Sequence, residues 1–135
     1  MDNLDKELKI KHKVLIVEND PDIIAVILIS IEGYNFLSQV ASSYSKALVG
    51  LSNFQPDVIL LDAMANNALN TFKLCREIRL NPQFSQIPLI LLSARGQRAE
   101  IEKIHKIKVD LYIDAPFNPE ELPKSMISFL EKKRT

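Results

Sequence analysis

The stretch Pro56-Asp57-Val58-Ile59-Leu60-Leu61-Asp62 is an apolar run that follows a proline and ends on a carboxylate. A short run that is apolar at consecutive positions is typical of a strand buried on both faces. Similar runs occur at 13–18, 88–93 and 111–113, and a weaker strand pattern occurs at 36–40. Capping and periodic patterns between the runs predict helices over about 21–32, 44–51, 71–80, 97–107 and 120–132, with a loop over 63–70. The sequence therefore predicts five strands that alternate with five helices.

This alternation predicts an α/β fold with a parallel sheet that is covered by helices on both faces. Short connections and right-handed crossovers favour a flavodoxin-like, doubly wound, five-stranded sheet of order 2-1-3-4-5. In such a sheet, a binding site forms at the carboxyl ends of the strands, beside the switch point between strands 1 and 3.

The composition indicates one globular domain. The 135 residues are 47% apolar and 25% charged, which is ordinary for a soluble protein long enough to bury a core. Seventeen basic residues balance seventeen acidic ones, so no overall charge attracts nucleic acid or a membrane surface. The single Cys75 lies in a helical pattern and is expected to be a buried thiol in a reducing cytoplasm.

The charged residues at the two ends suggest the domain organisation. Residues 1–11 are expected to form an N-terminal extension and are too charged for a signal peptide. Residues 12–132 form the expected domain, and residues 133–135 form a tail that would suit a linker to an output domain. No apolar run approaches the length of a membrane span.

Polar side chains follow the strands at the expected site. They are Glu18, Asn19 and Asp20 after strand 1, Asp62 after strand 3, Ser93 after strand 4, and the small Ala115 after strand 5. Converging carboxylates repel one another unless they hold a cation, and Mg²⁺ prefers oxygen ligands of this kind. A carboxylate beside Mg²⁺ could attack a phosphoryl donor, while the Ser93 hydroxyl could bond the transferred oxygens. Asp20 is better explained as the N-cap of the helix that starts at Pro21.

Four motifs in order carry a family resemblance. They are Val-Leu-Ile-Val-Glu-Asn-Asp-Pro-Asp at 14–22, Pro-Asp-Val-Ile-Leu-Leu-Asp-Ala-Met at 56–64, Ile-Pro-Leu-Ile-Leu-Leu-Ser-Ala-Arg-Gly at 87–96, and Ala-Pro-Phe-Asn-Pro-Glu-Glu-Leu at 115–122. Together they resemble the receiver domains of two-component response regulators, from about Lys13 to Lys132. The resemblance implies a CheY-like fold and a signalling module that is not an enzyme.

The resemblance also implies site roles. Asp62 matches the phospho-acceptor, while Glu18 and Asn19 occupy the acidic pair that binds Mg²⁺. The main-chain carbonyl of Met64 matches the third metal ligand. Ser93 and Tyr112 match the switch hydroxyl and the aromatic residue that moves with it, and Ala115 stands where the family has a lysine.

Several positions depart from the family pattern. Asn19 places a neutral amide where the family has a carboxylate, and Glu18 is one methylene longer than the usual aspartate. Ala115 removes the ammonium group that would contact phosphoryl oxygens, a charge-assisted interaction worth roughly 1.5–3 kcal/mol. The inner groups still sum to −2, so a divalent cation is attracted, although its ligand shell is poorer. The loop over 63–71 lacks the Met-Pro and Asp-Gly turns of the family.

Two signalling hypotheses follow. The first is an atypical, pseudo-receiver-like domain that is degenerate at the metal and lysine positions, binds Mg²⁺ weakly if at all, and acts through protein–protein contacts. The alternative is a functional phospho-acceptor that is phosphorylated on Asp62 with Mg²⁺. A flavin-binding enzyme is poorly supported, because the loop after strand 1 has no Ser/Thr/Gly-rich phosphate cradle and the chain has no Trp.

The first helix suggests a docking surface. Ile24, Leu28 and Ile31 recur along one outer face, where a histidine kinase or phosphotransfer protein could dock or a homodimer could form. The N-terminal extension, through Leu4 and Leu8, could instead cover that face. An output domain or protein is a further expected partner, and the last strand with its flanking helices is a second candidate interface.

Overall fold

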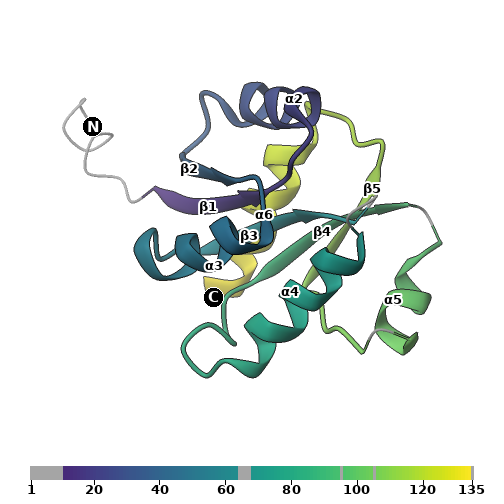
Figure 1. Ribbon diagram of the computed structural model, residues 1–135. Coiled ribbons are helices and arrows are strands. Elements are labelled where there is room, and N and C mark those ends of the chain that lie inside the picture. The colour runs from purple at the N-terminus through teal and green to yellow at the C-terminus, as the bar shows by residue number, and fades with distance from the viewer. Residues whose placement is uncertain (1–10, 64–67, 95, 105, 135) are drawn as a thin grey trace.

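The computed structural model describes residues 11–63, 68–94, 96–104 and 106–134. Five strands form one parallel sheet (Figure 1): β1 His12–Val17, β2 Phe36–Ala41, β3 Val58–Asp62, β4 Leu89–Ala94 and β5 Leu111–Ala115. Five helices connect and cover them: α2 Pro21–Ile31, α3 Tyr44–Asn53, α4 Ala68–Leu80, α5 Arg98–Ile104 and α6 Leu122–Arg134. The strand order is β2-β1-β3-β4-β5, which confirms the predicted topology. Met64, Leu4 and Leu8 lie outside the described residues.

The sheet separates two hydrophobic cores. On one face, Ile27 of α2 and Met126 of α6 pack against alternate residues of the central strands. On the other face, Leu51 of α3 and Leu74 of α4 pack against the intervening residues. Both faces of β1, β3 and β4 are therefore dry, which explains why these strands read as continuous apolar runs.

Local chemistry sets where α2 begins. Asp20 Oδ1 accepts hydrogen bonds from the main-chain N–H groups of Asp22 at 2.8 Å and Ile23 at 3.4 Å, and Pro21 occupies the first turn. This confirms the predicted cap. Gly33, just beyond the helix, has a φ of +85°, a conformation that glycine adopts without strain.

Several helix boundaries differ from the sequence prediction, and three of them have a local explanation. Helix α4 begins at Ala68 within the predicted loop, because asparagine is only a weak helix breaker. Helix α5 ends at Ile104, and the next described residue, Lys106, has a φ of +53° that is incompatible with helix. Helix α6 begins at Leu122 because the Asn118 side chain accepts the Glu120 N–H at 2.9 Å and forms a turn first.

The predicted docking stripe on the first helix is wrong. Ile31 is buried, Leu28 is half-buried and packs against the core under α2, and Ile24 is half-buried. The exposed apolar residues of this helix are Val26 and Ile29, 40% and 69% exposed. Because the helix is apolar almost all round, its periodicity could not show which stripe faces the sheet.

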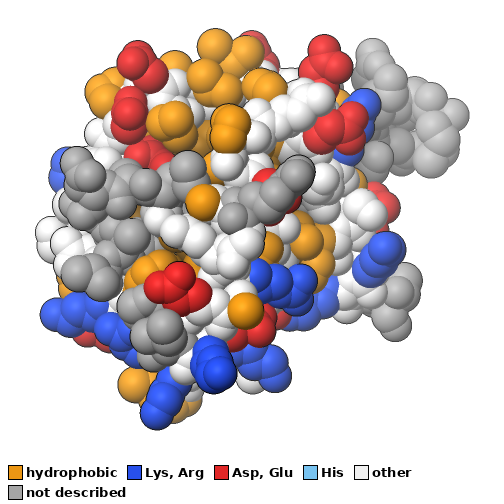
Figure 2. Space-filling view, turned by 90° about the vertical axis from the view of Figure 1, so that its right-hand side faces the viewer, with side chains coloured by type: hydrophobic (Ala, Val, Ile, Leu, Met, Phe, Trp, Pro, Cys, Tyr) orange, Lys and Arg blue, Asp and Glu red, His pale blue; other side chains and the backbone are white. Residues whose placement is uncertain are grey.

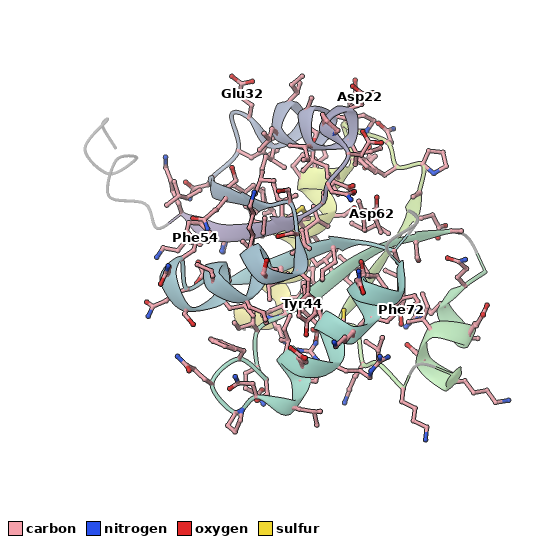
Figure 3. The ribbon with its side chains drawn as sticks, viewed as in Figure 1. Asp22, Glu32, Tyr44, Phe54, Asp62 and Phe72 are labelled. Atoms are coloured by element: carbon pink, nitrogen blue, oxygen red, sulfur yellow. The ribbon has the colours of Figure 1, made fainter. Side chains whose placement is uncertain are left out.

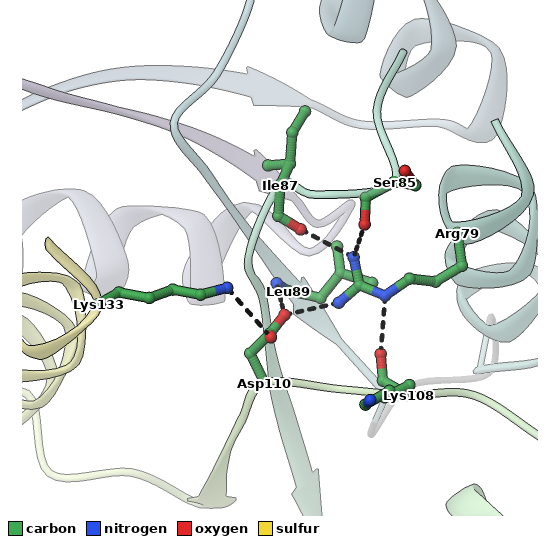
Figure 4. A network of polar contacts seen from close by, with 7 residues as sticks. All are labelled: Arg79, Ser85, Ile87, Leu89, Lys108, Asp110 and Lys133. Carbon is green, nitrogen blue, oxygen red and sulfur yellow. Dashed lines mark hydrogen bonds and ion pairs between the residues drawn. The ribbon is translucent and has the colours of Figure 1, made fainter. Parts of the chain in front are cut away.

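A polar network ties the opposite end of the sheet together (Figure 4). The Arg79 guanidinium donates to three main-chain carbonyls, those of Lys108, Ser85 and Ile87, at 3.0, 3.2 and 2.8 Å. It also pairs with Asp110 Oδ2 at 2.6 Å. Asp110 in turn accepts the Leu89 N–H at 2.7 Å and contacts Lys133 Nζ at 3.5 Å. One guanidinium therefore joins α4, the loop before β4 and the start of β5.

In the part of the chain that the structure describes, no helix combines the length and the apolar character that a transmembrane segment needs.

Candidate functional site

A cavity of about 230 Å³ opens at the carboxyl ends of β1 and β3. Figure 3 shows Asp62 at the end of β3 and Tyr44 at the start of α3. The lining consists of Val17, Glu18, Asn19, Ala41, Ser42, Ser43, Tyr44, Asp62, Asn70, Thr71 and Leu74. The cavity lies beside the switch point between β1 and β3, where the topology predicts a site.

Glu18 is the buried acid of the cavity, with 5% of its surface exposed. Its Oε1 accepts the main-chain N–H groups of Asn19 and Asp20, both at 3.0 Å. Its Oε2 is buried and has no hydrogen-bond partner among the described residues. The pKa of the Glu18 carboxyl is raised from 4.5 to about 7, first by burial and then by the nearby Asp62 side chain, while the two N–H groups partly oppose the shift. At neutral pH, Glu18 therefore carries only part of a negative charge.

This raised pKa predicts a pH-dependent stability that Glu18→Gln removes. Between pH 4.5 and about 7 the folded state holds a proton that the unfolded state has released, so stability falls as the pH rises through this window. The shift corresponds to about 3 kcal/mol. Urea unfolding in metal-free buffer at both ends of the window measures it. We expect the Glu18→Gln chain to lose about 3 kcal/mol less than the wild type, while the exposed control Glu121→Gln behaves as the wild type does. Equal losses in all three chains would contradict this explanation.

Asp62 ends β3 and is half-buried at the cavity wall. Its main-chain carbonyl accepts the Thr71 hydroxyl at 3.1 Å, which fixes α4 against the end of the strand. The next residue, Ala63, donates its N–H to the Leu92 carbonyl of β4 at 2.8 Å. The structure thus brings together three of the predicted site residues, Glu18, Asn19 and Asp62.

The three predicted switch positions lie on neighbouring strands and are not part of the cavity lining. Ser93 is 2% exposed and pairs with Asp114 in the sheet, while Ala94 pairs with Ala115. Ala115 packs against the core on the α2 and α6 side. The Ala115–Pro116 peptide bond is cis.

Tyr112 is held in place by α5. The Arg98 guanidinium carbon lies 4.9 Å from the centroid of the Tyr112 ring, a cation–π contact. Arg98 also pairs with Glu102 at 3.6 Å, one turn further along the helix. Burial raises the pKa of the Tyr112 hydroxyl to about 12, and the charge of Glu102 adds to this shift. A charged pair of α5, whose side chains are 71% and 47% exposed, therefore lies beside the ring.

One side of the cavity, which we call the second wall, was absent from the sequence prediction. This wall consists of Ser42, Ser43 and Tyr44 from the start of α3, with Asn70 and Thr71 from α4. Its signal was present, because the two serines follow strand 2 at the same edge of the sheet. Ser43 also caps α3, since its hydroxyl accepts the Lys46 N–H at 3.1 Å.

The donor set of the cavity fits a hard divalent cation. Glu18, Asn19 and Asp62 offer carboxylate and amide oxygens, and Glu18 Oε2 is a buried carboxylate oxygen that lacks a hydrogen-bond donor. The set is small, since the described residues contain no group of three or more His, Cys, Asp or Glu side chains placed to hold a metal ion. No Lys or Arg occurs among the described residues that line the cavity.

The fold and cavity define a doubly wound α/β domain with an acidic site at its switch point. A family model described as "Response regulator receiver domain" matches residues 14–127, and the chain belongs to this family of two-component signalling domains. The "Probable transcriptional regulator ycf29" of Guillardia theta is 32% identical over 97% of this chain and 59% of its own length. This chain spans about half the length of the curated relatives it matches, between 47% and 59% for the first three.

Solved structures show the same fold. The chemotaxis response regulator CheY4 of Vibrio cholerae has a TM-score of 0.75 at 21% identity, covering 88% of this chain and 98% of its own. The receiver domain of the sensor histidine kinase PA1611 from Pseudomonas aeruginosa has a TM-score of 0.75 at 21% identity, covering 90% and 98%. That structure holds a magnesium ion in its active-site cleft.

Proposed function

We propose that this receiver domain is degenerate, that its output depends weakly on phosphorylation of Asp62, and that it acts through protein–protein contacts. The observation that carries the proposal is the charge of the cavity. Glu18 and Asp62 line it, no cationic side chain does so among the described residues, and Ala115 occupies the family's lysine position.

The chemistry open to the site is phosphoryl transfer to a carboxylate. An Asp62 oxygen would attack the phosphorus of a donor such as acetyl phosphate, form an acyl phosphate and release acetate. Glu18, Asn19 and Asp62, with the main-chain carbonyl of Met64, would hold Mg²⁺. When bound, this ion neutralises charge on the transferred phosphoryl oxygens.

Two features of the chain weaken this chemistry. The Glu18 carboxyl, with a pKa of about 7, carries only part of a negative charge at neutral pH and attracts a cation less than an ionised acid does. Ala115 supplies no ammonium group to the phosphoryl oxygens, a loss of roughly 1.5–3 kcal/mol. Both features slow transfer of the phosphoryl group to Asp62.

Tyr112 supports weak coupling between the acid site and the outer surface. The family's switch aromatic moves when its hydroxyl-bearing partner, here Ser93, moves. In this chain, Arg98 and Glu102 already hold the ring without any phosphoryl group. Tyr112 therefore already has a contact with α5 that phosphorylation of Asp62 does not make.

The alternative function is a working phospho-acceptor. The orphaned Oε2 of Glu18 beside Asp62 favours it, because a cation there would supply the partner that this buried oxygen lacks. In either case the expected partners are a histidine kinase or phosphotransfer protein and an output domain or protein, in the cytoplasm. Val26 and Ile29, which are exposed on α2, would suit a docking surface for such a partner.

Phosphorylation from a small donor separates the two functions. The full chain is incubated with acetyl phosphate and Mg²⁺, and the added phosphoryl group is followed by intact mass, with Asp62→Asn as the control. We expect slow and substoichiometric labelling that Asp62→Asn abolishes. Rapid and complete labelling of Asp62 would reject the degenerate receiver in favour of the phospho-acceptor.

A further inference from the structure

The exposed apolar residues of this domain are concentrated around one edge of the sheet. Seven large hydrophobic side chains are exposed in the part of the chain that the structure describes, and six of them belong to α2, β2, α3 or the loop between α2 and β2. They are Val26, Ile29, Tyr34, Leu37, Leu48 and Val49. Only Leu80, at the end of α4, lies elsewhere. Hydrophobic side chains also gather at the top of Figure 2, at the height of α2 in Figure 1.

The strand at this edge is β2, between α2 and α3 (Figure 1). It pairs with β1 on one side, and no described strand pairs with it on the other. Its sequence, Phe-Leu-Ser-Gln-Val-Ala, contains no charged residue, proline or glycine. Edge strands usually carry such residues because they prevent pairing with another chain. β2 lacks that protection.

The main-chain groups of β2 point outward in a self-complementary pattern. Asn35 and Ala41 direct their carbonyls toward β1, where His12 and Glu18 donate to them at 3.0 and 3.2 Å. By the alternation of a parallel ladder, the odd residues of β2 face β1 and the even residues face outward. The N–H groups of Ser38 and Val40 and the carbonyls of residues 36, 38 and 40 are therefore directed away from the sheet. The N–H of residue 36 already bonds the Tyr34 carbonyl at 2.8 Å.

We propose that β2 pairs in antiparallel fashion with β2 of a second copy of this chain, about a twofold axis at Ser38. In this register, the main-chain N–H of Ser38 in each copy donates to the Ser38 carbonyl of the other copy, which makes two hydrogen bonds. Each Val40 N–H also meets the Phe36 carbonyl of the opposite copy. Four main-chain hydrogen bonds form, and none of them requires a bond to β1 to break.

The side chains fit the same register. Residues that face one another in an antiparallel pair lie on the same side of the sheet, so Leu37 of one copy lies against Gln39 of the other. A shallow hollow lined by Gln39, Val40, Ser45, Lys46 and Val49 lies there. Leu37 is 48% exposed and Val49 57% exposed in the single copy. Pairing would bury each against the other copy.

The size of the β2 edge and the charge of the chain favour a second copy of the chain as the partner of β2. A six-residue strand is about 20 Å long, and a sheet with a helix layer on each face is about 30 Å thick, giving roughly 600 Å² per copy. The total of about 1,200 Å² is at the lower limit of specific interfaces, which predicts a dimer that dissociates in the micromolar range. The chain carries no net charge at pH 7, so two copies do not repel each other over distance.

Sedimentation equilibrium of the full chain, from about 5 to about 500 μM, tests the proposal. We expect a monomer–dimer equilibrium that Leu37→Lys and Ser38→Pro each weaken at least tenfold. Leu37→Lys places a charge in the interface, and Ser38→Pro removes an outward N–H without breaking a bond to β1. The matched control is Leu80→Lys, a similar change at a residue 81% exposed on α4, which should dimerise as the wild type does.

Thermal unfolding confirms that each variant is folded. Hydrogen exchange supplies a second readout, since the amides of Ser38 and Val40 should become better protected as the concentration rises. A wild type that remains monomeric throughout overturns the proposal, as does a dimer that the two edge variants leave intact. Protection of these amides that does not change with concentration also overturns it, because the edge would then be covered by another segment of the same chain, such as residues 1–10.

Discussion

Ala115→Lys is expected to increase the rate of Asp62 phosphorylation by acetyl phosphate about 10- to 100-fold. Ala115 ends β5 and pairs with Ala94 at the end of β4. Because β3, β4 and β5 are parallel, this is the same edge of the sheet at which Asp62 ends β3. A lysine there would bring an ammonium group toward the transferred phosphoryl oxygens. A charge-assisted hydrogen bond of roughly 1.5–3 kcal/mol corresponds to that range of rates. Intact-mass time courses with Mg²⁺ at fixed donor concentration measure the change.

Ala115→Met is the matched control, because it adds a chain of similar length without a charge. Ala115 packs against the core on the α2 and α6 side, so both variants alter packing and both need a thermal unfolding curve. We expect the methionine variant to react at the wild-type rate. If both variants react equally, or if the folded lysine variant reacts no faster than the wild type, the missing cation does not limit the chemistry.

Arg79→Met is expected to lower the free energy of unfolding by about 3 kcal/mol. The side chains of Arg79 and Asp110 are only 20% and 24% exposed. Removing the guanidinium leaves three carbonyls without their donor, and Asp110 keeps only its weaker contact with Lys133 and the Leu89 N–H. Losing one partner of a largely buried pair typically costs about 3–5 kcal/mol, and partial exposure places this case at the lower end.

Urea unfolding monitored by circular dichroism measures this loss. Arg76→Met serves as the control, since Arg76 lies on the same helix but is exposed, and exposed charges contribute about 0–1 kcal/mol. Arg79→Lys should recover little, because an ammonium group cannot reproduce the planar fork that reaches several carbonyls at once. A loss for Arg79→Met no larger than that for Arg76→Met would show that the network does not stabilise the fold.

The three central strands could be predicted because burial on both faces leaves a signal in each of them, and the strand order followed from the alternation of strands and helices. Val58 to Leu61 are apolar at every position, and no other element needs to be known to recognise them. The start of α2 was equally local, since Asp20 and Pro21 form a cap that depends only on neighbouring residues. The acidic residues of the site followed from the topology, because the ends of β1 and β3 must meet at one edge.

The predictions that failed concern features that depend on packing between elements. A rotation of α2 by one residue, about 100°, decides whether Leu28 or Ile29 faces solvent, and the sequence of an all-apolar helix does not contain that information. The cavity wall of Tyr44 and Thr71 arises where α3 and α4 approach each other. The network of Arg79 joins residues about 30 positions apart, as the pairing with Asp110 shows. No local sequence pattern predicts such contacts.

The most direct test of the degenerate receiver is the response of the wild-type backbone amides to beryllofluoride, a phosphoryl mimic, with Mg²⁺. Two-dimensional ¹H–¹⁵N spectra report every main-chain N–H at once. We predict shifts confined to residues around the cavity, such as Asn19 and Ala63, with Tyr112 and Arg98 unchanged at saturating mimic. Shifts that extend through Ser93 to Tyr112 and along α5 would contradict the account, because they would show that the acid site still controls the outer surface.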